Sequence, residues 1–137
     1  QSRNFLKIAG GLSVVEWRTL WDLAEAGPLS ISDLAAIQRA DHSLISRALP
    51  VMRKKGYVTM HKDGRDGRQT VVALTEVGRA AYDRAAPVMA QRRAALRQYF
   101  SQDEIRVFAG FLDRLEDFMQ VPTTELLADP IAQEDIK

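Results

Sequence analysis

The sequence has 137 residues, 46% of them hydrophobic and 27% charged, which suits one small globular domain with an extension. It contains no cysteine, which excludes disulfides and cysteine metal sites, and no apolar run is long enough to span a membrane. The net charge of +1 hides an asymmetry: residues 39–68 carry eight Lys/Arg against three Asp, and residues 101–137 carry nine acids against three bases. A basic middle is typical of a polyanion-binding protein, although a solvated charged face is the plainer alternative.

Three helix starts are marked by capping boxes, in which a Ser is followed three residues later by an acid that returns to the Ser backbone. The pairs are Ser13 with Glu16, Ser30 with Asp33, and Ser101 with Glu104. The first pair predicts a helix that ends at a Gly-Pro stop near residue 26, and the second a short helix over 31–38. The third pair begins the last helix of the chain.

The middle of the chain predicts a helix followed by a hairpin. After a break at residues 39–41, Asp41 is a good N-cap, and Gly56 is a natural C-terminal stop for this helix. Two β-branched runs, over 57–62 and 69–74, then flank a loop with two Asp-Gly pairs. A short helix, a tight turn, a helix and a hairpin form a winged helix-turn-helix.

The remaining residues predict two long helices. Thr75 caps one that runs to about Phe100, and the last helix has apolar residues spaced 3, 4, 3, 4, as in a dimerisation seam. The seam residues are Ile105, Phe108, Leu112, Leu115 and Met119. Packing of these helices within one chain is the alternative. We therefore expect a mainly α fold with a small antiparallel β wing. Residues 12–75 would form the winged lobe, 1–11 and 76–120 the dimerisation helices, and 121–137 a C-terminal tail.

The helix after Asp41 has the composition of a recognition helix. Ile45, Leu49 and Met52 are predicted to face the core. The side chains predicted to contact DNA are His42, Ser43, Ser46 and Arg47, with Arg39 before the helix and Lys54 in its last turn as basic additions. Small polar side chains permit close approach, and Arg can read guanine bidentately. Each feature alone also fits ordinary capping or solvation, but their combination favours DNA.

The stretch HKDGRDGRQT, residues 61–70, supplies the hairpin tip. Its Asp-Gly pairs suit tight turns, but a turn does not require Arg65 and Arg68. Arginine on a hairpin tip can enter the minor groove, where it is attracted by the negative potential of narrow A·T-rich stretches. Asp66, two residues before Arg68, is predicted to hold that arginine's geometry. The alternative is plain turn chemistry with solvated arginines.

From Leu12 to about Met119 the sequence resembles the MarR family of winged-helix transcriptional regulators. The matching stretches are LSVVEWRTLWDLAEAGPLSISDLA, DHSLISRAL, KKGYV and DGRQTVVALTEVGR. The resemblance implies an obligate homodimer joined through terminal helices on a pseudo-palindromic operator in double-stranded DNA. It also implies a recognition helix in the major groove and a wing arginine, Arg68, in the minor groove. Pro50 departs from the pattern and predicts a bend or a shortened recognition helix.

Trp17 and Trp21 lie one turn apart on the first capped helix. The resemblance implies an effector pocket between the winged lobe and the dimerisation helices, which these aromatic rings could line for a small aromatic or amphipathic effector. Ordinary core packing is the stronger interpretation.

No catalytic or metal site is expected. His42 and His61 are the only histidines, and the motifs for zinc, phosphate and nucleophile-elbow sites are missing from the sequence. We therefore expect no cofactor and a dimeric, cytoplasmic, DNA-binding regulator that is a repressor released by an effector. The competing hypothesis is a winged helix used for protein interaction without specific DNA binding.

Overall fold

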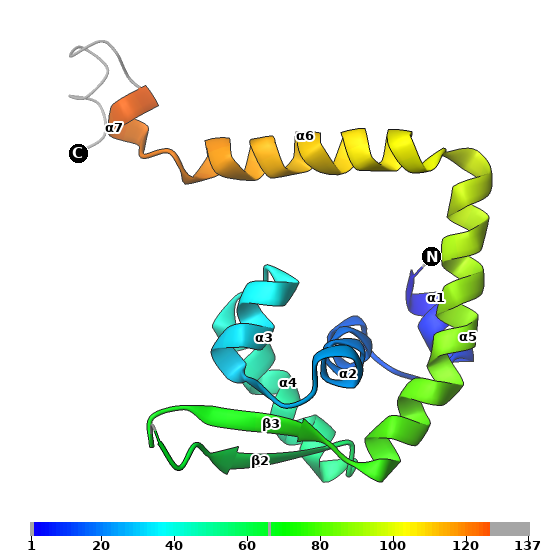
Figure 1. Cartoon of the computed structure of the whole chain (residues 1–137), viewed down its shortest axis with the longest axis vertical. Helices are drawn as coiled ribbons and strands as arrows, with labels where there is room; N and C mark the ends of the chain where they lie inside the picture. Colours follow the sequence, from blue (N-terminus) through cyan, green and yellow to red (C-terminus); the bar gives the residue numbers. More distant parts are fainter. Residues whose placement is uncertain (1, 66, 127–137) are drawn as a thin grey trace. The chain divides into compact units, whose positions relative to one another are not determined.

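The computed structural model describes residues 2–65 and 67–126. Its elements are α1 (Ser2–Ile8), α2 (Val14–Ala26), β1 (Leu29–Ser30), α3 (Ile31–Gln38), α4 (His42–Lys54), β2 (Val58–Lys62), β3 (Thr70–Leu74), α5 (Glu76–Tyr99), α6 (Gln102–Gln120) and α7 (Thr123–Leu126). The chain divides into two compact units, Gln1–Ala94 and Ala95–Lys137. In the first unit, α2, α3 and α4 gather beside the β2–β3 hairpin (Figure 1). The expected mainly α fold with a small antiparallel sheet is confirmed.

The three predicted capping boxes all form. At the start of α2, Ser13 Oγ accepts a hydrogen bond from the Glu16 backbone N–H (3.1 Å), and Glu16 Oε2 accepts one from the Ser13 N–H (2.8 Å). The corresponding pairs begin α3 and α6. Because the first N–H groups of a helix have no partner within it, these side chains determine where each helix begins.

The sheet has the strand order β1-β3-β2, with both pairings antiparallel. Val58 lies opposite Leu74 and Lys62 opposite Thr70, so the hairpin matches the predicted runs to within one residue at each end. The sequence did not predict β1, since a two-residue strand is too short to show alternation. Its Leu29 pairs with Val72 and ties the start of α3 to the wing.

The end of α4 and the start of α5 meet at one junction. Gly56 follows α4 with φ of 78°, which suits glycine. The Thr75 hydroxyl donates to the Gly56 carbonyl and accepts from the Gly78 N–H (3.0 Å), while the Thr75 N–H donates to the Tyr57 carbonyl (3.1 Å). A Cβ on Gly78 would lie 2.1 Å from the Tyr57 oxygen, so the close approach requires glycine.

The first unit has a single hydrophobic core. Its most deeply buried apolar side chains, each no more than 2% exposed, are Leu6, Leu20, Leu23, Leu34, Ile45, Leu49, Met52, Val58, Val72 and Ala85. The predicted core face of α4 is thereby confirmed. Shortening at Pro50, one of the two outcomes predicted, does not occur, because α4 continues to Lys54 with buried residues on both sides of the proline.

In the second unit, α6 presents its apolar seam to solvent. None of its described residues is buried. Phe108 is 63% exposed and Leu115 56% exposed. An open apolar pocket of about 640 Å³ is lined by Leu96, Phe100, Asp103, Glu104, Ile105, Val107, Phe108 and Phe111. The seam is therefore not buried by packing within its own unit.

Candidate nucleic-acid interface

The predicted base-contacting side chains lie on the solvent side of α4. His42, Ser43 and Arg47 are exposed, and Ser46 is half-buried. Ser46 Oγ lies 3.2 Å from His42 Nδ1, and Arg47 Nε donates to the Ser43 carbonyl at 3.3 Å. These contacts are local and solvent-accessible, so small side-chain rotations can replace them with contacts to bases or phosphates.

The first turn of α4 is fixed by Asp41. Its carboxylate accepts a hydrogen bond from the Ser43 N–H at 2.9 Å, and this bond holds the pKa of Asp41 below its ordinary value. An ionised cap at the helix start stabilises the positive end of the helix dipole. The cap therefore orients the turn that carries His42 and Ser43.

The two basic additions flank this helix. Arg39 is the C-cap of α3 and has left-handed backbone angles (φ 47°, ψ 47°), unlike any other non-glycine residue that the structure describes. Glycine is usual in such a cap, so Arg39 holds a costly conformation in the tight turn that precedes α4. Lys54 is exposed in the last turn of α4, seven residues after Arg47, and these two side chains share one helix face.

The hairpin loop carries the wing arginines. Asp63 closes the loop by donating its N–H to the Gln69 carbonyl (2.9 Å), and its carboxylate accepts from the Arg65 N–H (3.1 Å). Arg65 and Arg68 are both exposed. The predicted positioning role of Asp66 falls outside the described residues. The first unit therefore presents an exposed helix face and an exposed basic loop as the two parts of the candidate interface.

Trp17 and Trp21 belong to an aromatic cluster with Tyr82 of α5. Trp17 is 6% exposed and stacks on Tyr82 with a centroid distance of 5.7 Å, and Trp21 meets Trp17 edge-on at 5.5 Å. The guanidinium of Arg93 lies 4.5 Å from the Trp21 ring centroid, a cation–π contact. Core packing, the stronger expectation, thus describes Trp17 well.

The same tryptophans also line an open pocket of about 310 Å³ formed by α2, α3 and α5. Its lining residues are Trp17, Arg18, Trp21, Asp22, Ile37, Gln38, Met89, Arg92 and Arg93. Burial raises the pKa of Asp22, although a hydrogen bond from Gln38 opposes the shift. Arg92 Nε is buried and has no acceptor among the described residues. The sequence analysis did not select Arg92 and Arg93; the adjacent arginine pair on a long helix was their only signal.

Within residues 2–65 and 67–126, no group of three or more His, Asp or Glu side chains could hold a metal ion. No helix in this part of the chain is long and apolar enough to cross a membrane.

The sequence matches a family model described as the MarR family over residues 10–69. A curated relative, the HTH-type transcriptional repressor IacR of Pseudomonas putida, is 40% identical over 67 residues. That match covers 49% of this chain and 40% of the repressor, so the chain spans less than half of that relative.

Solved structures share the fold over most of the chain. One is a MarR family transcriptional regulator from Streptomyces coelicolor in complex with DNA (TM-score 0.76, 22% identity, 88% of this chain and 78% of that one covered). Another is the PcaV transcriptional regulator from the same organism in complex with its natural ligand (TM-score 0.73, 19% identity, 85% and 84% covered). At these identities the likeness establishes the fold.

Proposed function

We propose that this chain belongs to the MarR family, whose model matches residues 10–69, and that it is a dimeric, sequence-specific DNA-binding repressor in the cytoplasm, released from its operator by a small molecule. The observation that carries the proposal is the pairing, in one lobe, of an exposed polar and basic face on α4 with an exposed basic hairpin loop. His42, Ser43, Ser46 and Arg47 would contact bases and nearby phosphates in the major groove. Arg68 and Arg65 would enter the minor groove, with Arg39 and Lys54 on the backbone.

The dimer would form through the long helices over residues 76–120. The exposed apolar seam of α6 supports it, because a soluble chain rarely leaves several large apolar side chains of one helix face in water. A two-fold dimer would place two recognition helices on half-sites about one helical turn apart. Such spacing requires a palindromic operator.

The direct test is selection from a random pool of duplex DNA by the purified protein. Enrichment of a palindromic motif with half-sites about one turn apart would support the proposal. If nothing is enriched and retention is lost at moderate salt, the basic surface binds polyanions only non-specifically. The protein-interaction hypothesis would then take first place.

The effector would bind in the pocket lined by Trp17 and Trp21. Aromatic rings beside Arg18, Arg92 and Arg93 suit a small planar or amphipathic molecule with an acidic group. Because α5 contributes to both the pocket and the proposed dimer, an occupant of the pocket can change the separation of the two recognition helices. If the two recognition helices were equally far apart in effector-free and effector-bound structures, this mechanism would be contradicted.

The chain's two tryptophans both line this pocket, so their fluorescence reports its occupancy. Titration with small aromatic acids should quench or shift the emission. A binding compound should also weaken operator binding at the concentration that saturates the fluorescence change. Arg93→Ala is the matched variant, because it removes the cation over Trp21 and leaves both fluorophores in place.

A further inference from the structure

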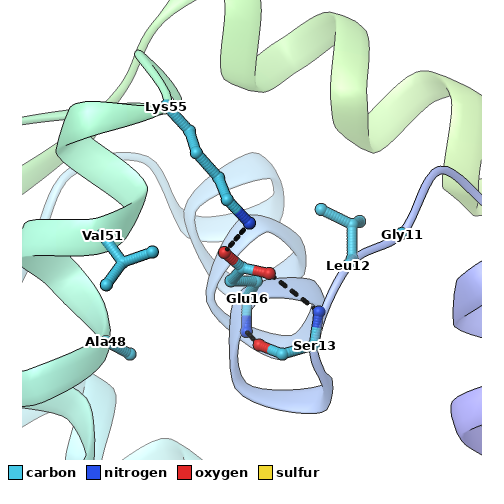
Figure 2. Close-up of a pocket in the computed structure, with 7 residues that line it drawn as sticks. All are labelled: Gly11, Leu12, Ser13, Glu16, Ala48, Val51 and Lys55. Atoms are coloured by element: carbon cyan, nitrogen blue, oxygen red, sulfur yellow. Dashed lines mark hydrogen bonds and ion pairs between the residues drawn. The ribbon is translucent and has the colours of Figure 1, made fainter.

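A second open pocket of the first unit, of about 440 Å³, lies between the start of α2 and the last turns of α4. Its lining residues are Gly11, Leu12, Ser13, Glu16, Ala48, Val51 and Lys55. Figure 2 shows Lys55 extending from the end of α4 to Glu16 in the first turn of α2, with Ala48 and Val51 on the same side of α4. The contact joins residues 39 positions apart in sequence.

The carboxylate of Glu16 takes part in a local cap and a long-range ion pair at once. Oε2 accepts from the Ser13 N–H at 2.8 Å, and Oε1 accepts from Lys55 Nζ at 2.6 Å. Glu16 is only 4% exposed. Burial raises the pKa of Glu16, but the hydrogen bonds from Lys55 and Ser13 and the charge of Lys55 together hold it below the ordinary value. A buried carboxylate that stays charged requires its cationic partner, so Lys55 is restrained more than a surface lysine is.

Lys55 lies on a different helix face from its neighbour Lys54. Ala48, Val51 and Lys55 recur at intervals of three and four, so they form one stripe, which lines the pocket. Arg47 and Lys54 lie about 100° away on the stripe that carries the predicted DNA contacts. The side chain of Lys55 is 41% exposed, so it would be accessible to other anions if Glu16 released it.

We propose that Glu16 is a positioning residue of the DNA-binding lobe. By binding Lys55, it fixes the C-terminal end of α4 against α2 and withholds one cation from the DNA phosphates. This inference rests on the proposed DNA-binding function. Its consequence is that the ion pair favours operator over non-operator DNA, because it holds the reading helix in place and limits sequence-independent attraction.

The test compares salt dependence and specificity in matched variants. Glu16→Gln retains a side chain that can complete the capping box but removes the charge that holds Lys55. The salt slope is the slope of the logarithm of the binding constant against the logarithm of the salt concentration. The released lysine should steepen this slope for non-specific binding by about 0.9 per added phosphate contact. The ratio of operator to non-operator affinity should fall about tenfold, a size typical of coupling between contacting residues.

Lys55→Met and Lys54→Met complete the comparison. Lys54→Met should flatten the salt slope by about one unit per half-site, as expected for the loss of a phosphate contact. Lys55→Met should leave the slope unchanged and lower the specificity ratio as Glu16→Gln does. Binding is measured by fluorescence anisotropy on operator and scrambled duplexes at several salt concentrations.

Two results would overturn the inference. A salt slope for Lys55→Met as flat as that of Lys54→Met would mean that Lys55 contacts phosphate. An unchanged ratio of operator to non-operator affinity in both Glu16→Gln and Lys55→Met would remove the positioning role. Failure of the unaltered protein to prefer any sequence would overturn the proposed function itself, and this is measured before any substitution. Circular dichroism melts identify an unfolded variant; Lys55→Met, which leaves the Ser13–Glu16 cap in place, then carries the test.

Discussion

The two units of this protein differ in where their apolar side chains lie. In the lobe, Leu20, Ile45 and Leu49 are fully buried, whereas in α6 Phe108 and Leu115 are more than half exposed. A core of the first kind stabilises one chain by itself, while an exposed apolar helix face gains stability only against another surface. We infer that the first unit is complete in one chain and that the helical unit requires a second copy.

The same contrast holds for one local motif that occurs in both units. Ser13–Glu16 and Ser101–Glu104 form equivalent capping boxes, each with hydrogen bonds in both directions. Glu16 also binds Lys55 and is buried, whereas Glu104 is exposed in the single chain. A capping motif therefore predicts where a helix begins, but it does not predict whether the cap also contacts a distant element.

Phe108→Lys should have the largest effect. A charge placed in the proposed two-fold interface removes two buried rings and desolvates two ammonium groups. The dimer dissociation constant should rise roughly 1,000-fold or more. Operator affinity should fall by at least about 100-fold, because bivalent binding is lost. Analytical ultracentrifugation and anisotropy measure the two effects.

Asp117→Lys is the matched control for this substitution. It places the same side chain on the opposite face of α6, about 180° from Phe108. The dimer should persist in this variant, and the lobe should remain folded in both, as judged by circular dichroism. Equal dissociation by the two substitutions would contradict an interface through the seam.

Gly78→Ala should have the next largest effect, and it should fall on the first unit alone. The added Cβ would lie 2.1 Å from the Tyr57 carbonyl oxygen, so backbone at the α4–α5 junction must move. We expect a loss of about 1–3 kcal/mol in the free energy of unfolding. Gly110→Ala in α6 meets nothing within 4 Å and should raise helix stability by about 0.5–1 kcal/mol. Denaturant unfolding measures both, and a stabilised Gly78→Ala would contradict the required close approach.

Local features of the lobe could be predicted from the sequence because their causes are local. The capping serines, Gly56 and the two β-branched runs act on their immediate neighbours, so the helix and strand boundaries followed within a residue or two. The short strand β1 could not be predicted, because it exists only through its pairing with β3. The family resemblance supplied the expectation of a dimer, which the apolar spacing of α6 supports.

Tertiary contacts of the site could not be predicted in the same way. Lys55 entered the sequence analysis only within the matching stretch KKGYV, and its ion pair depends on how α4 packs against α2. Arg92 and Arg93 line the tryptophan pocket because this part of α5 lies beside α2 and α3. Partners this far apart in sequence leave no periodic signal in one chain.

Arg68→Ala should weaken DNA binding without changing the assembly. Loss of one wing arginine should reduce the salt slope by about one unit per half-site and operator affinity by about tenfold. Arg84→Ala removes an exposed cation from the same unit outside the predicted interface and serves as the control. An unchanged slope in Arg68→Ala would count against the wing assignment. Sedimentation should give the same mass for both variants.

The smallest expected effect is a difference between the two capping glutamates, Glu16 and Glu104. They should differ in how much each contributes to the loss of unfolding free energy at acidic pH. The pKa of Glu16 is lowered in the folded chain, so its ionisation contributes stability that is complete above the unfolded pKa of about 4.3 and is lost as pH falls through the folded pKa. Glu16→Gln should therefore reduce the loss of unfolding free energy between neutral and acidic pH. At Asp22 burial outweighs the opposing contacts and the pKa is raised, but Asp22 is present in both proteins and cancels in the comparison.

Glu104→Gln is the matched variant in the other unit. Hydrogen bonds from Ser101 lower the pKa of Glu104 too, but its carboxylate is exposed and solvent screens its charge. Both substitutions are made in a Leu115→Lys background, so that dimer formation does not contribute to the unfolding free energy. A lysine at position 115 disrupts the same seam without standing four residues after Glu104, where it would form a new ion pair. A larger change in acid sensitivity for Glu16→Gln than for Glu104→Gln follows from the ion pair with Lys55. Equal changes would mean that the cap alone, and not the contact with α4, sets the response of Glu16.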